Sequence, residues 1–410
     1  MKTEVSVAQA DWLKADATRK VIAALEAARP SGARFVGGCV RNTLMGHPVS
    51  DIDIATQLLP DQTIAACNAA GIKTFPTGIE HGTITAVCDH IPFEITTLRR
   101  DVETDGRRAV VAFTEDWAED AQRRDFRLNA LYADADGIVY DPTGGLADIS
   151  TGQIVFIGEA EQRLREDHLR NLRFFRFNAW YGAGFDATGL AACQALRDGL
   201  HQIAAERIWT EFYKLLKAPA PFEAIRAMID TGVMSVILPE CDEVVTRLTA
   251  LQGIEAANDF RFDAMQRLMC LLRRDRPTAI AVAKRLKVSK AERERLVNWA
   301  KAAPPPDEIG TLPVWLYRHS DQAGLDIIAW EWAEHGDRED DSYLALWQFA
   351  RNWTRPEFPL RGADLLAVGI ETGPDMGTEF RRIEDLWIEN GFSLDGLDDP
   401  LIRSVQQLKR

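Results

Sequence analysis

The stretch from residue 35 to residue 56 constrains the fold of this chain most strongly. A strand-like apolar run ends in the pair Gly37-Gly38, and a short helical segment follows it. Asp51 and Asp53 then stand one residue apart among β-branched neighbours. Because side chains i and i+2 of a strand point to the same face, the two carboxylates are expected side by side. Such a pair of like charges predicts a bound cation.

The same stretch predicts a site for a phosphate group. A glycine pair between a strand and a helix lets backbone N–H groups approach an anion, and the helix N-terminus favours negative charge. Arg41 lies one turn into the helix and can reach a phosphate oxygen. With a divalent ion on Asp51 and Asp53, the pattern predicts a triphosphate–metal site that includes Gly37 and Gly38. The structural alternative is a tight turn followed by a solvated acidic strand end.

Composition limits the class of protein. The 410 residues, 46% hydrophobic and 27% charged, suit two to four globular domains. The net charge of −14 argues against a large non-specific nucleic-acid surface but not against a local basic groove. No apolar run is long enough to span a membrane, no signal peptide is evident, and the six cysteines lack metal-binding spacing. We therefore expect a cytoplasmic protein with reduced thiols and no membrane partner.

Periodicity predicts an α+β fold, in which a mixed region up to about residue 155 precedes an entirely helical remainder. The mixed region contains apolar patterns typical of helices at 1–30, 39–45 and 61–70. Strand patterns stand at 34–37, 50–55, 83–87, 91–98 and 109–113, and a hairpin is expected across 131–140. In the helical remainder, Ser289 opens a capping box.

The segment 93–99 offers a further carboxylate. Glu94 alternates with apolar neighbours on an expected strand, so it is a candidate third catalytic carboxylate beside Asp51 and Asp53. An exposed strand glutamate is the equal alternative. The arginine-rich segment 99–108 that follows is expected to be a loop, one that could clamp a substrate.

The segment 123–130 carries a second candidate group for a nucleotide. Arg124 suits a phosphate, and either Asp125 or Asn129 suits a ribose hydroxyl. A salt-bridged helix start would explain the same residues.

The segment 163–177 concentrates arginine in an acidic chain. On one continuous helix, Asp167 and Arg170 are neighbours at i,i+3, and Arg173 and Arg176 follow at the same step. An aspartate beside an arginine offers acceptors and donors that can read the edge of a base. The alternative is a surface salt bridge.

Together these segments resemble the class II tRNA nucleotidyltransferase (CCA-adding enzyme) and bacterial poly(A) polymerase family, of the polymerase-β nucleotidyltransferase superfamily. The resemblance rests on GGCVRNTLMGHPVSDIDIAT, RRDFRLNALY, EDHLRNLRFFRF and the helix ERIWTEF, within residues 34–217. It implies a catalytic head with a small mixed sheet, followed by helical neck, body and tail domains that bind tRNA. We place the head at 1–155, the neck at 156–220, the body at 221–303 and the tail at 304–410.

The resemblance also implies a role for each matching residue. Asp51 and Asp53 would bind Mg²⁺, and Glu94 stays the candidate third carboxylate beside them. The residues that would contact the nucleotide are Gly38, Arg41, Arg124, Arg173 and Arg176. Asp167 and Arg170 would select cytosine or adenine, acting as a template made of amino acids. Asn42 departs from the family, which usually has aspartate there, and this puts the salt bridge of that aspartate in doubt.

The implied activity is addition of CCA to the 3′ end of tRNA from CTP and ATP, with release of pyrophosphate. Segment 77–83 resembles the tRNA enzymes rather than the poly(A) polymerases, and segment 99–108 resembles the complete loop of enzymes that add more than CC. Poly(A) polymerase and A-only addition stay open as alternatives within the family. A non-enzymatic RNA-binding protein is the alternative from another class, and the intact aspartate pair argues against it.

Overall fold

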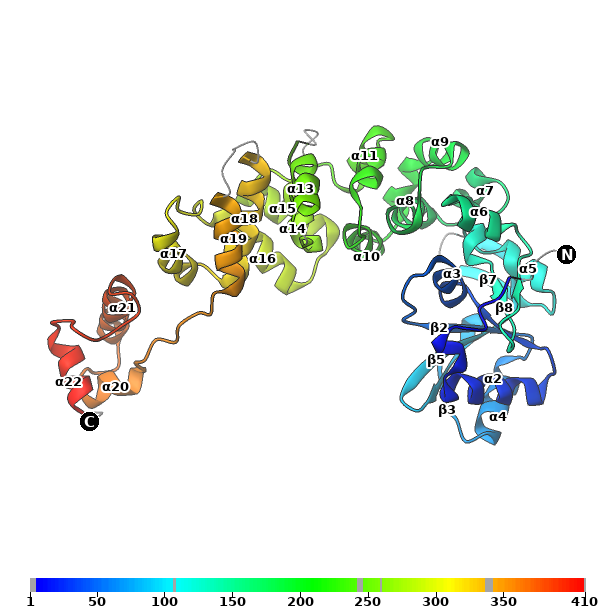
Figure 1. Ribbon diagram of the computed structural model, residues 1–410, viewed down its shortest axis with the longest axis horizontal. Coiled ribbons are helices and arrows are strands. Elements are labelled where there is room, and N and C mark those ends of the chain that lie inside the picture. The colour runs from blue at the N-terminus through cyan, green and yellow to red at the C-terminus, as the bar shows by residue number, and fades with distance from the viewer. Residues whose placement is uncertain (1–4, 106–107, 242–245, 259, 336–341, 409–410) are drawn as a thin grey trace. The chain divides into compact units, whose positions relative to one another are not determined.

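The structure is a computed structural model that describes residues 5–105, 108–241, 246–258, 260–335 and 342–408 (Figure 1). The chain divides into two compact units, Met1–Pro239 and Glu240–Arg410. Within the described ranges, no helix combines the length and the apolarity needed to cross a membrane. Each of the six cysteines is a free thiol, and only Cys241 is not buried.

The described residues of the first unit include a seven-stranded mixed sheet with the strand order β3-β4-β5-β2-β1-β8-β9. β2 and β5 are parallel, and the other neighbouring strands are antiparallel. The strands are β1 (Ala33–Val36), β2 (Ile52–Thr56), β3 (Lys73–Gly78), β4 (Thr83–Cys88), β5 (Ile91–Thr97), β8 (Tyr132–Ala133) and β9 (Val139–Tyr140). This sheet confirms the predicted mixed α and β head, and β8 with β9 forms the predicted hairpin.

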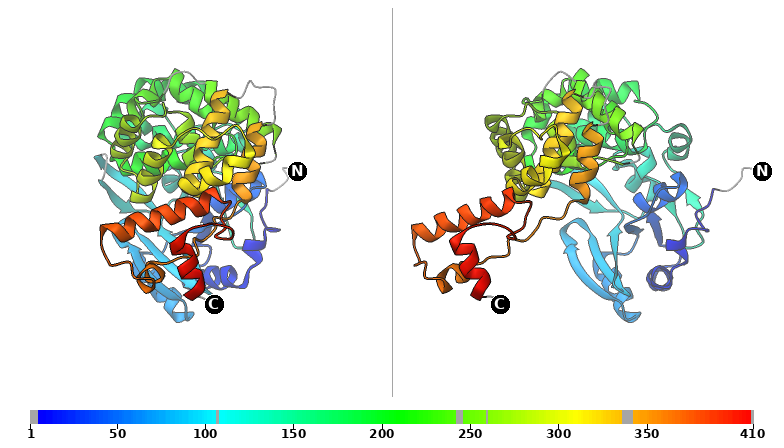
Figure 2. Two further views of the ribbon diagram at one scale, coloured as in Figure 1. Left: turned by 90° about the vertical axis from the view of Figure 1, so that its left-hand side faces the viewer. Right: turned by 60° about the vertical axis from the view of Figure 1, so that its left-hand side comes forward.

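Helices cover the sheet. They are α1 (Asp11–Lys14), α2 (Asp16–Ala28), α3 (Gly38–Met45), α4 (Pro60–Ala69), α5 (Trp117–Gln122) and α6 (Gly145–Thr151), with the short η1 (Ile79–His81) and η2 (Arg127–Asn129). α2 and α4 pack on one face, over a core that includes Ile54 and Phe93 (Figures 1 and 2). A smaller cluster, which includes Ala55, lies on the other face. Because side chains alternate along a strand, Asp53 and Glu94 belong to the face opposite Ile54 and Phe93.

Two expectations for the head are wrong in detail, and one strand was not predicted. The helix expected at 1–30 is interrupted at Ala15, whose extended backbone separates α1 from α2, and residues 1–4 lie outside the described part. β3 was not among the predicted strands; it contains Pro76, which an edge strand tolerates. The loop expected at 99–108 contains β6 (Arg99–Asp105), which pairs with β7 (Arg108–Phe113) as a separate hairpin.

The rest of the first unit is helical. Its elements are α7 (Ala160–Glu166), α8 (Leu169–Tyr181), α9 (Ala187–Ala195), η3 (Arg197–Gln202), α10 (Ala205–Leu216), α11 (Phe222–Asp230) and α12 (Val233–Ile237). The single helix expected through residues 163–177 is wrong, because α7 ends at Glu166 and α8 begins at Leu169. Asp167 has an extended backbone, and its carboxylate accepts a hydrogen bond from the Leu169 N–H at 3.0 Å. This hydrogen bond satisfies the N–H of the first residue of α8, which has no acceptor within the helix.

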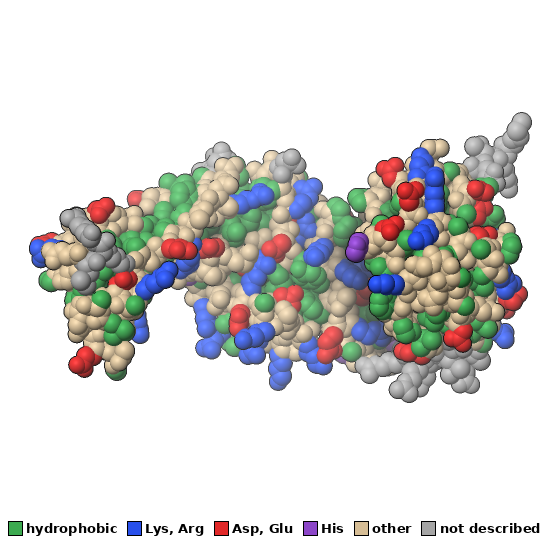
Figure 3. Space-filling view, turned by 90° about the horizontal axis from the view of Figure 1, so that it is seen from below, with side chains coloured by type: hydrophobic (Ala, Val, Ile, Leu, Met, Phe, Trp, Pro, Cys, Tyr) green, Lys and Arg blue, Asp and Glu red, His purple; other side chains and the backbone are tan. Residues whose placement is uncertain are grey.

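The second unit consists of helices in its described part, as expected. They are α13 (Thr246–Ala257), α14 (Ala264–Cys270), α15 (Arg276–Leu286), α16 (Lys290–Lys301), η4 (Ile309–Thr311), α17 (Leu312–Arg318), α18 (Asp321–His335), α19 (Ser342–Asn352), α20 (Gly362–Ala367), α21 (Pro374–Glu389) and α22 (Pro400–Leu408). Ser289 forms the predicted capping box of α16. Basic, acidic and apolar side chains are interspersed on the face shown in Figure 3. The boundaries at 155, 220 and 303 stay predictions.

Candidate active site

The turn between β1 and α3 is built on Gly37. Its φ of 71° lies in the region that glycine adopts readily and other residues rarely adopt. Gly38 opens α3, and a Cβ placed on it would meet no heavy atom within 4 Å. The first N–H groups of a helix have no partner within the helix, so this open turn can accept an anion.

The carboxylates lie on neighbouring parallel strands. Asp53 on β2 is in register with Glu94 on β5, and Asp51 directly precedes β2. Asp53 is half-buried, whereas Asp51 and Glu94 are exposed. Burial, the Glu94 charge and the Asp51 charge raise the pKa of Asp53 to about 6, although Arg124 opposes the shift. The negative charge gathered at Asp53 favours a cation there.

The donor set suits a divalent metal ion with open coordination positions. Among the described residues, no group of three or more histidine, cysteine, aspartate or glutamate side chains is arranged to hold a metal ion. Mg²⁺ in phosphoryl-transfer sites usually binds one or two carboxylates and takes its other ligands from substrate phosphates and water. The oxygen donors of Asp51 and Asp53 fit that pattern.

Arg41 is buried and held by uncharged acceptors. It donates to the side-chain oxygen of Asn129, to the Tyr181 hydroxyl at 3.0 Å and to Asn42 Oδ1 at 2.7 Å. Burial lowers the pKa of Arg41, but an arginine keeps its charge at neutral pH. The positive charge of Arg41 therefore has no ion-pair partner within the described ranges, and it remains available to a ligand.

The structure accounts for Asn42. Its Oδ1 accepts from Arg41, and its Nδ2 donates to the Pro48 carbonyl at 2.8 Å. An aspartate could accept from Arg41 but could not donate to Pro48. Compared with an aspartate at this position, Asn42 lacks the salt bridge to Arg41 but adds a hydrogen bond to the segment that leads to Asp51.

Asp120 organises the arginines that precede Asp125. This fully buried carboxylate pairs with Arg123 at 2.8 Å and Arg124 at 3.0 Å, and it accepts from the Tyr132 hydroxyl at 2.7 Å. Although burial opposes ionisation, the two arginines lower the pKa of Asp120 to about 2. Arg124 also reaches the glycine turn, because a Cβ on Gly37 would lie 3.9 Å from its Nη1.

Asp125 and Asn129 connect Arg41 to α8. Asn129 accepts from Arg41 and donates to Asp125 Oδ1 at 2.9 Å, and Asp125 Oδ2 accepts from Arg173 Nε at 2.7 Å. The Arg173 charge and the Asn129 hydrogen bond outweigh burial and lower the pKa of Asp125 to about 2. These bonds occupy both groups that were predicted to contact a ribose, so in this structure they hold Arg41 and Arg173.

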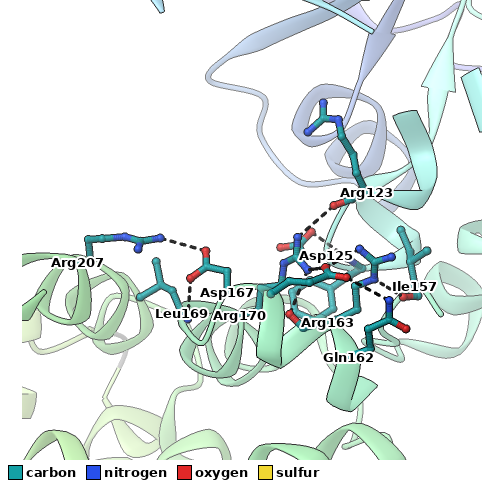
Figure 4. A network of polar contacts seen from close by, with 11 residues as sticks. Arg123, Asp125, Ile157, Gln162, Arg163, Asp167, Leu169, Arg170 and Arg207 are labelled. Carbon is teal, nitrogen blue, oxygen red and sulfur yellow. Dashed lines mark hydrogen bonds and ion pairs between the residues drawn. The ribbon is translucent and has the colours of Figure 1, made fainter. Parts of the chain in front are cut away.

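Asp167 and Arg170 are close in sequence but have different partners. Asp167 Oδ2 pairs with Arg207 on α10 at 3.0 Å, whereas Arg170 pairs with Glu166 at 2.6 Å. Arg170 also donates to the Arg123 carbonyl at 3.2 Å. Figure 4 shows Asp167 facing Arg207 while Arg170 lies on the other side with Arg163. The break between α7 and α8 separates the two groups.

Two adjoining cavities bring most of the predicted residues together. The first, of about 500 Å³, is lined by residues that include Gly37, Gly38, Arg41, Asp53, Arg124, Asp125, Asn129, Asp167, Arg170 and Arg173. The second, of about 440 Å³, shares Gly38, Arg41 and Asp53 with the first and adds Asp51 and Arg176. Glu94 lines neither cavity, although it is in register with Asp53.

Comparison with known proteins identifies the family. The family described as "Poly A polymerase head domain" matches residues 33–155, and "Probable RNA and SrmB- binding site of polymerase A" matches residues 185–244. The mouse protein named CCA tRNA nucleotidyltransferase 1, mitochondrial, is 32% identical over 381 residues, which cover 88% of this chain and 84% of the mouse protein. The chain belongs to the CCA tRNA nucleotidyltransferase family.

Further relatives agree with that family. The CCA-adding enzyme of Streptococcus pyogenes serotype M2 is 43% identical over 199 residues, 48% of each chain. The crystal structure of the Bacillus stearothermophilus CCA-adding enzyme in complex with CTP matches with 26% identity and a TM-score of 0.74, over 96% of this chain and 97% of that one. The predictions of family, fold and nucleotidyltransferase class are therefore confirmed. Enzymes with this head domain generally require a divalent metal ion.

Several residues of this candidate site were not singled out from the sequence. Arg207 lines the first cavity and lies in the quoted ERIWTEF helix, so the motif already contained the signal. Asp120 precedes Arg123 and Arg124 by three and four residues, a spacing typical of helical ion pairs. Trp180 and Tyr181 line the second cavity, but on sequence alone they resemble ordinary core aromatics.

Proposed function

We propose that this protein adds CCA to the 3′ end of tRNA without a nucleic-acid template, using CTP and ATP and releasing pyrophosphate. The proposal rests on the charged residues that line the first cavity. Among the described residues that line it, seven are arginines and three are aspartates. This excess of positive charge suits a nucleoside triphosphate, and the cavity adjoins the carboxylate Asp53. The names of the relatives favour CCA addition over the poly(A) alternative.

The chemistry follows from this arrangement. The N–H groups at Gly38 and the side chains of Arg41 and Arg124 bind the triphosphate. The terminal RNA 3′-oxygen attacks the α-phosphorus, the bond from that phosphorus to the oxygen bridging to the β-phosphorus breaks, and the hydroxyl proton passes to solvent. Asp51 and Asp53 would hold Mg²⁺, and the ion would lower the pKa of the attacking hydroxyl and neutralise charge on the departing pyrophosphate.

Base selection belongs to the residues at the start of α8. Asp167 and Arg170 have different partners in this structure, but both line the first cavity. The exocyclic amino group of cytosine or adenine in that cavity can donate to Asp167, and the ring acceptor can receive a hydrogen bond from Arg170. Uracil presents an oxygen in place of the amino group, which leaves the carboxylate unpaired. Arg173, which is fixed by Asp125, supports the nucleotide from the same helix, whereas Arg176 lines the second cavity.

One assay tests the proposal. The protein receives tRNA that lacks its last three nucleotides, Mg²⁺, and labelled CTP and ATP, and the products are sized. We expect three added nucleotides. A long ladder would indicate poly(A) synthesis, extension only of tRNA that already ends in CC would indicate A-only addition, and no product would indicate a binding protein.

Matched variants connect the activity to the carboxylate pair. Asp51→Asn and Asp53→Asn should each abolish incorporation of both nucleotides while the protein stays folded, because the metal ligands are lost. Asp61→Asn, an exposed position at the start of α4, is the control and should keep full activity. Normal turnover by either site variant contradicts the metal assignment.

The cytoplasmic location of the protein stays a prediction, which cell fractionation would check. The mouse relative is named mitochondrial.

A further inference from the structure

The second cavity has a composition that the triphosphate does not explain. Its lining includes His47, Asp51, Trp180, Tyr181 and Lys214. These side chains combine aromatic rings with a lysine, beside a carboxylate assigned to the metal. The cavity lies entirely within the first compact unit, so all its walls belong to one body.

The two cavities meet at the reacting centre. Gly38, Arg41 and Asp53 line both of them. Helix α8 also contributes to both, with Arg170, Arg173 and Phe177 in the first and Arg176, Trp180 and Tyr181 in the second. Nucleotidyl transfer joins two substrates at one centre, and a triphosphate in the first cavity leaves the second for the attacking group.

Charge distinguishes the second cavity from the first. The charged residues of its described lining are the cations Arg41, Arg176 and Lys214 and the carboxylates Asp51 and Asp53. Arg176 is already paired with buried Glu211 at 2.6 Å. The exposed Lys214 has no such partner within the described residues. Arg41 also lacks an ion-pair partner in the described part of the chain, but it lines both cavities and is assigned to the triphosphate. Lys214 lines only the second cavity and suits a single phosphodiester, whereas a triphosphate with about four charges needs the arginine-rich cavity.

The aromatic side chains suit an unpaired base. The rings of Trp180 and Tyr181 lie 6.3 Å apart, and His47 meets Tyr181 edge-on at 5.4 Å. Tyr181 is fixed because its hydroxyl accepts from Arg41, and Trp180 is fixed because its Nε1 donates to the Lys214 carbonyl at 2.9 Å. Both rings remain partly exposed. Rigid, partly exposed rings beside a cation are typical of single-stranded RNA sites.

We propose that the second cavity receives the 3′-terminal nucleotide of the acceptor RNA, whose base stacks on Trp180 and whose phosphodiester lies at Lys214. The terminal 3′-hydroxyl then lies toward Asp51 and Asp53, opposite the triphosphate. This inference rests on the proposed function, because it assigns the second substrate of that same reaction.

The test uses tRNA that lacks CCA and carries 2-aminopurine as its 3′-terminal base, since stacking quenches the fluorescence of that base. We expect quenching by the native protein, loss of quenching with Trp180→Ala, and retention with Trp180→Phe, which keeps a ring. The KM for the RNA should rise about 5- to 100-fold in Trp180→Ala, while the KM for CTP changes less than about twofold.

Lysine variants test the phosphate contact without altering the core. Lys214→Gln should make the slope of log affinity for the RNA against log salt shallower by about 0.7, the value for one single-stranded phosphate. Lys217→Gln is the matched control, since Lys217 is exposed at the end of the same helix and lies outside the cavity. The slope should not change in this control.

The outcomes separate the two proposals. If the native protein adds nothing to tRNA, the proposed function fails. If the native protein adds CCA but Trp180→Ala keeps both the quenching and the KM for the RNA, the inference is overturned. An equal rise in both KM values, or equal salt slopes for Lys214→Gln and Lys217→Gln, overturns it as well.

Discussion

Asp167→Asn should change which pyrimidine nucleotide the protein accepts. The carboxylate can only accept hydrogen bonds, so it suits the amino group of cytosine and rejects O4 of uracil. The amide offers a donor at the same place, so O4 of uracil gains a partner. Asp167 Oδ1 accepts from the Leu169 N–H at 3.0 Å, and the amide oxygen can keep that bond.

The expected magnitude follows from two contacts. A polar group left without a partner costs about 1–3 kcal/mol, which corresponds to about 5- to 150-fold in selectivity. The substitution also breaks the Asp167–Arg207 pair, whose side chains are 29% and 38% exposed. A pair exposed to that extent contributes at most about 1 kcal/mol to folding. The preference for CTP over UTP should therefore fall by at least about fivefold, with little loss of stability.

Single-nucleotide incorporation into tRNA lacking CCA measures this effect. The ratio of kcat/KM for CTP to kcat/KM for UTP is compared between the native protein and Asp167→Asn, and thermal melting checks the fold. Glu161→Gln provides a control, because Glu161 forms an exposed pair with Arg165 on α7 and lines neither cavity. An unchanged ratio in a folded Asp167→Asn protein refutes the role assigned to this carboxylate.

Three further perturbations test the site. Asp125→Asn should lower the free energy of unfolding by about 2–3 kcal/mol at pH 7, because the pKa of Asp125 lies near 2 when folded and near 3.8 when unfolded. This stabilisation is present above pH 4 and declines as the pH falls toward 2, so urea titrations at pH 7 and pH 3 should show a smaller difference at pH 3. Gly37→Ala should cost about 1–3 kcal/mol in the same titration, because its φ is 71°, whereas Gly38→Ala should cost less than 1 kcal/mol. Removal of divalent ions with EDTA should abolish incorporation, and added Mg²⁺ should restore it; activity that persists in EDTA contradicts the metal requirement.

The sequence predicted the elements whose signals are local. The glycine pair, the alternation around Asp53 and the capping box at Ser289 each depend on neighbouring residues, and the structure has the elements they predict. Asp53 and Glu94 are in register because β2 and β5 pair in parallel. No local sequence pattern specifies that pairing.

The errors arose where distant contacts override a local pattern. Helical spacing runs unbroken through 163–177, but the backbone at Asp167 is extended, and a Cβ on Gly199 would lie 2.1 Å from His168 Nδ1. Gly199 lies 31 positions after His168 in the chain, so helical periodicity around residue 168 cannot predict this packing. The break matters because it turns Asp167 toward Arg207 and away from Arg170.

The arginines of the site differ in how their charge is balanced, and this difference predicts different roles for them. Arg124 and Arg173 are held by the buried carboxylates Asp120 and Asp125, so much of their charge is neutralised before a ligand arrives. Arg41 is equally fixed in place, but its acceptors are two amide oxygens and a hydroxyl. Because Arg41 lines both cavities, its charge acts at the junction where the α-phosphorus would lie. In the proposed reaction, the paired arginines would define the shape of the nucleotide site, and Arg41 would supply positive charge at the point of reaction.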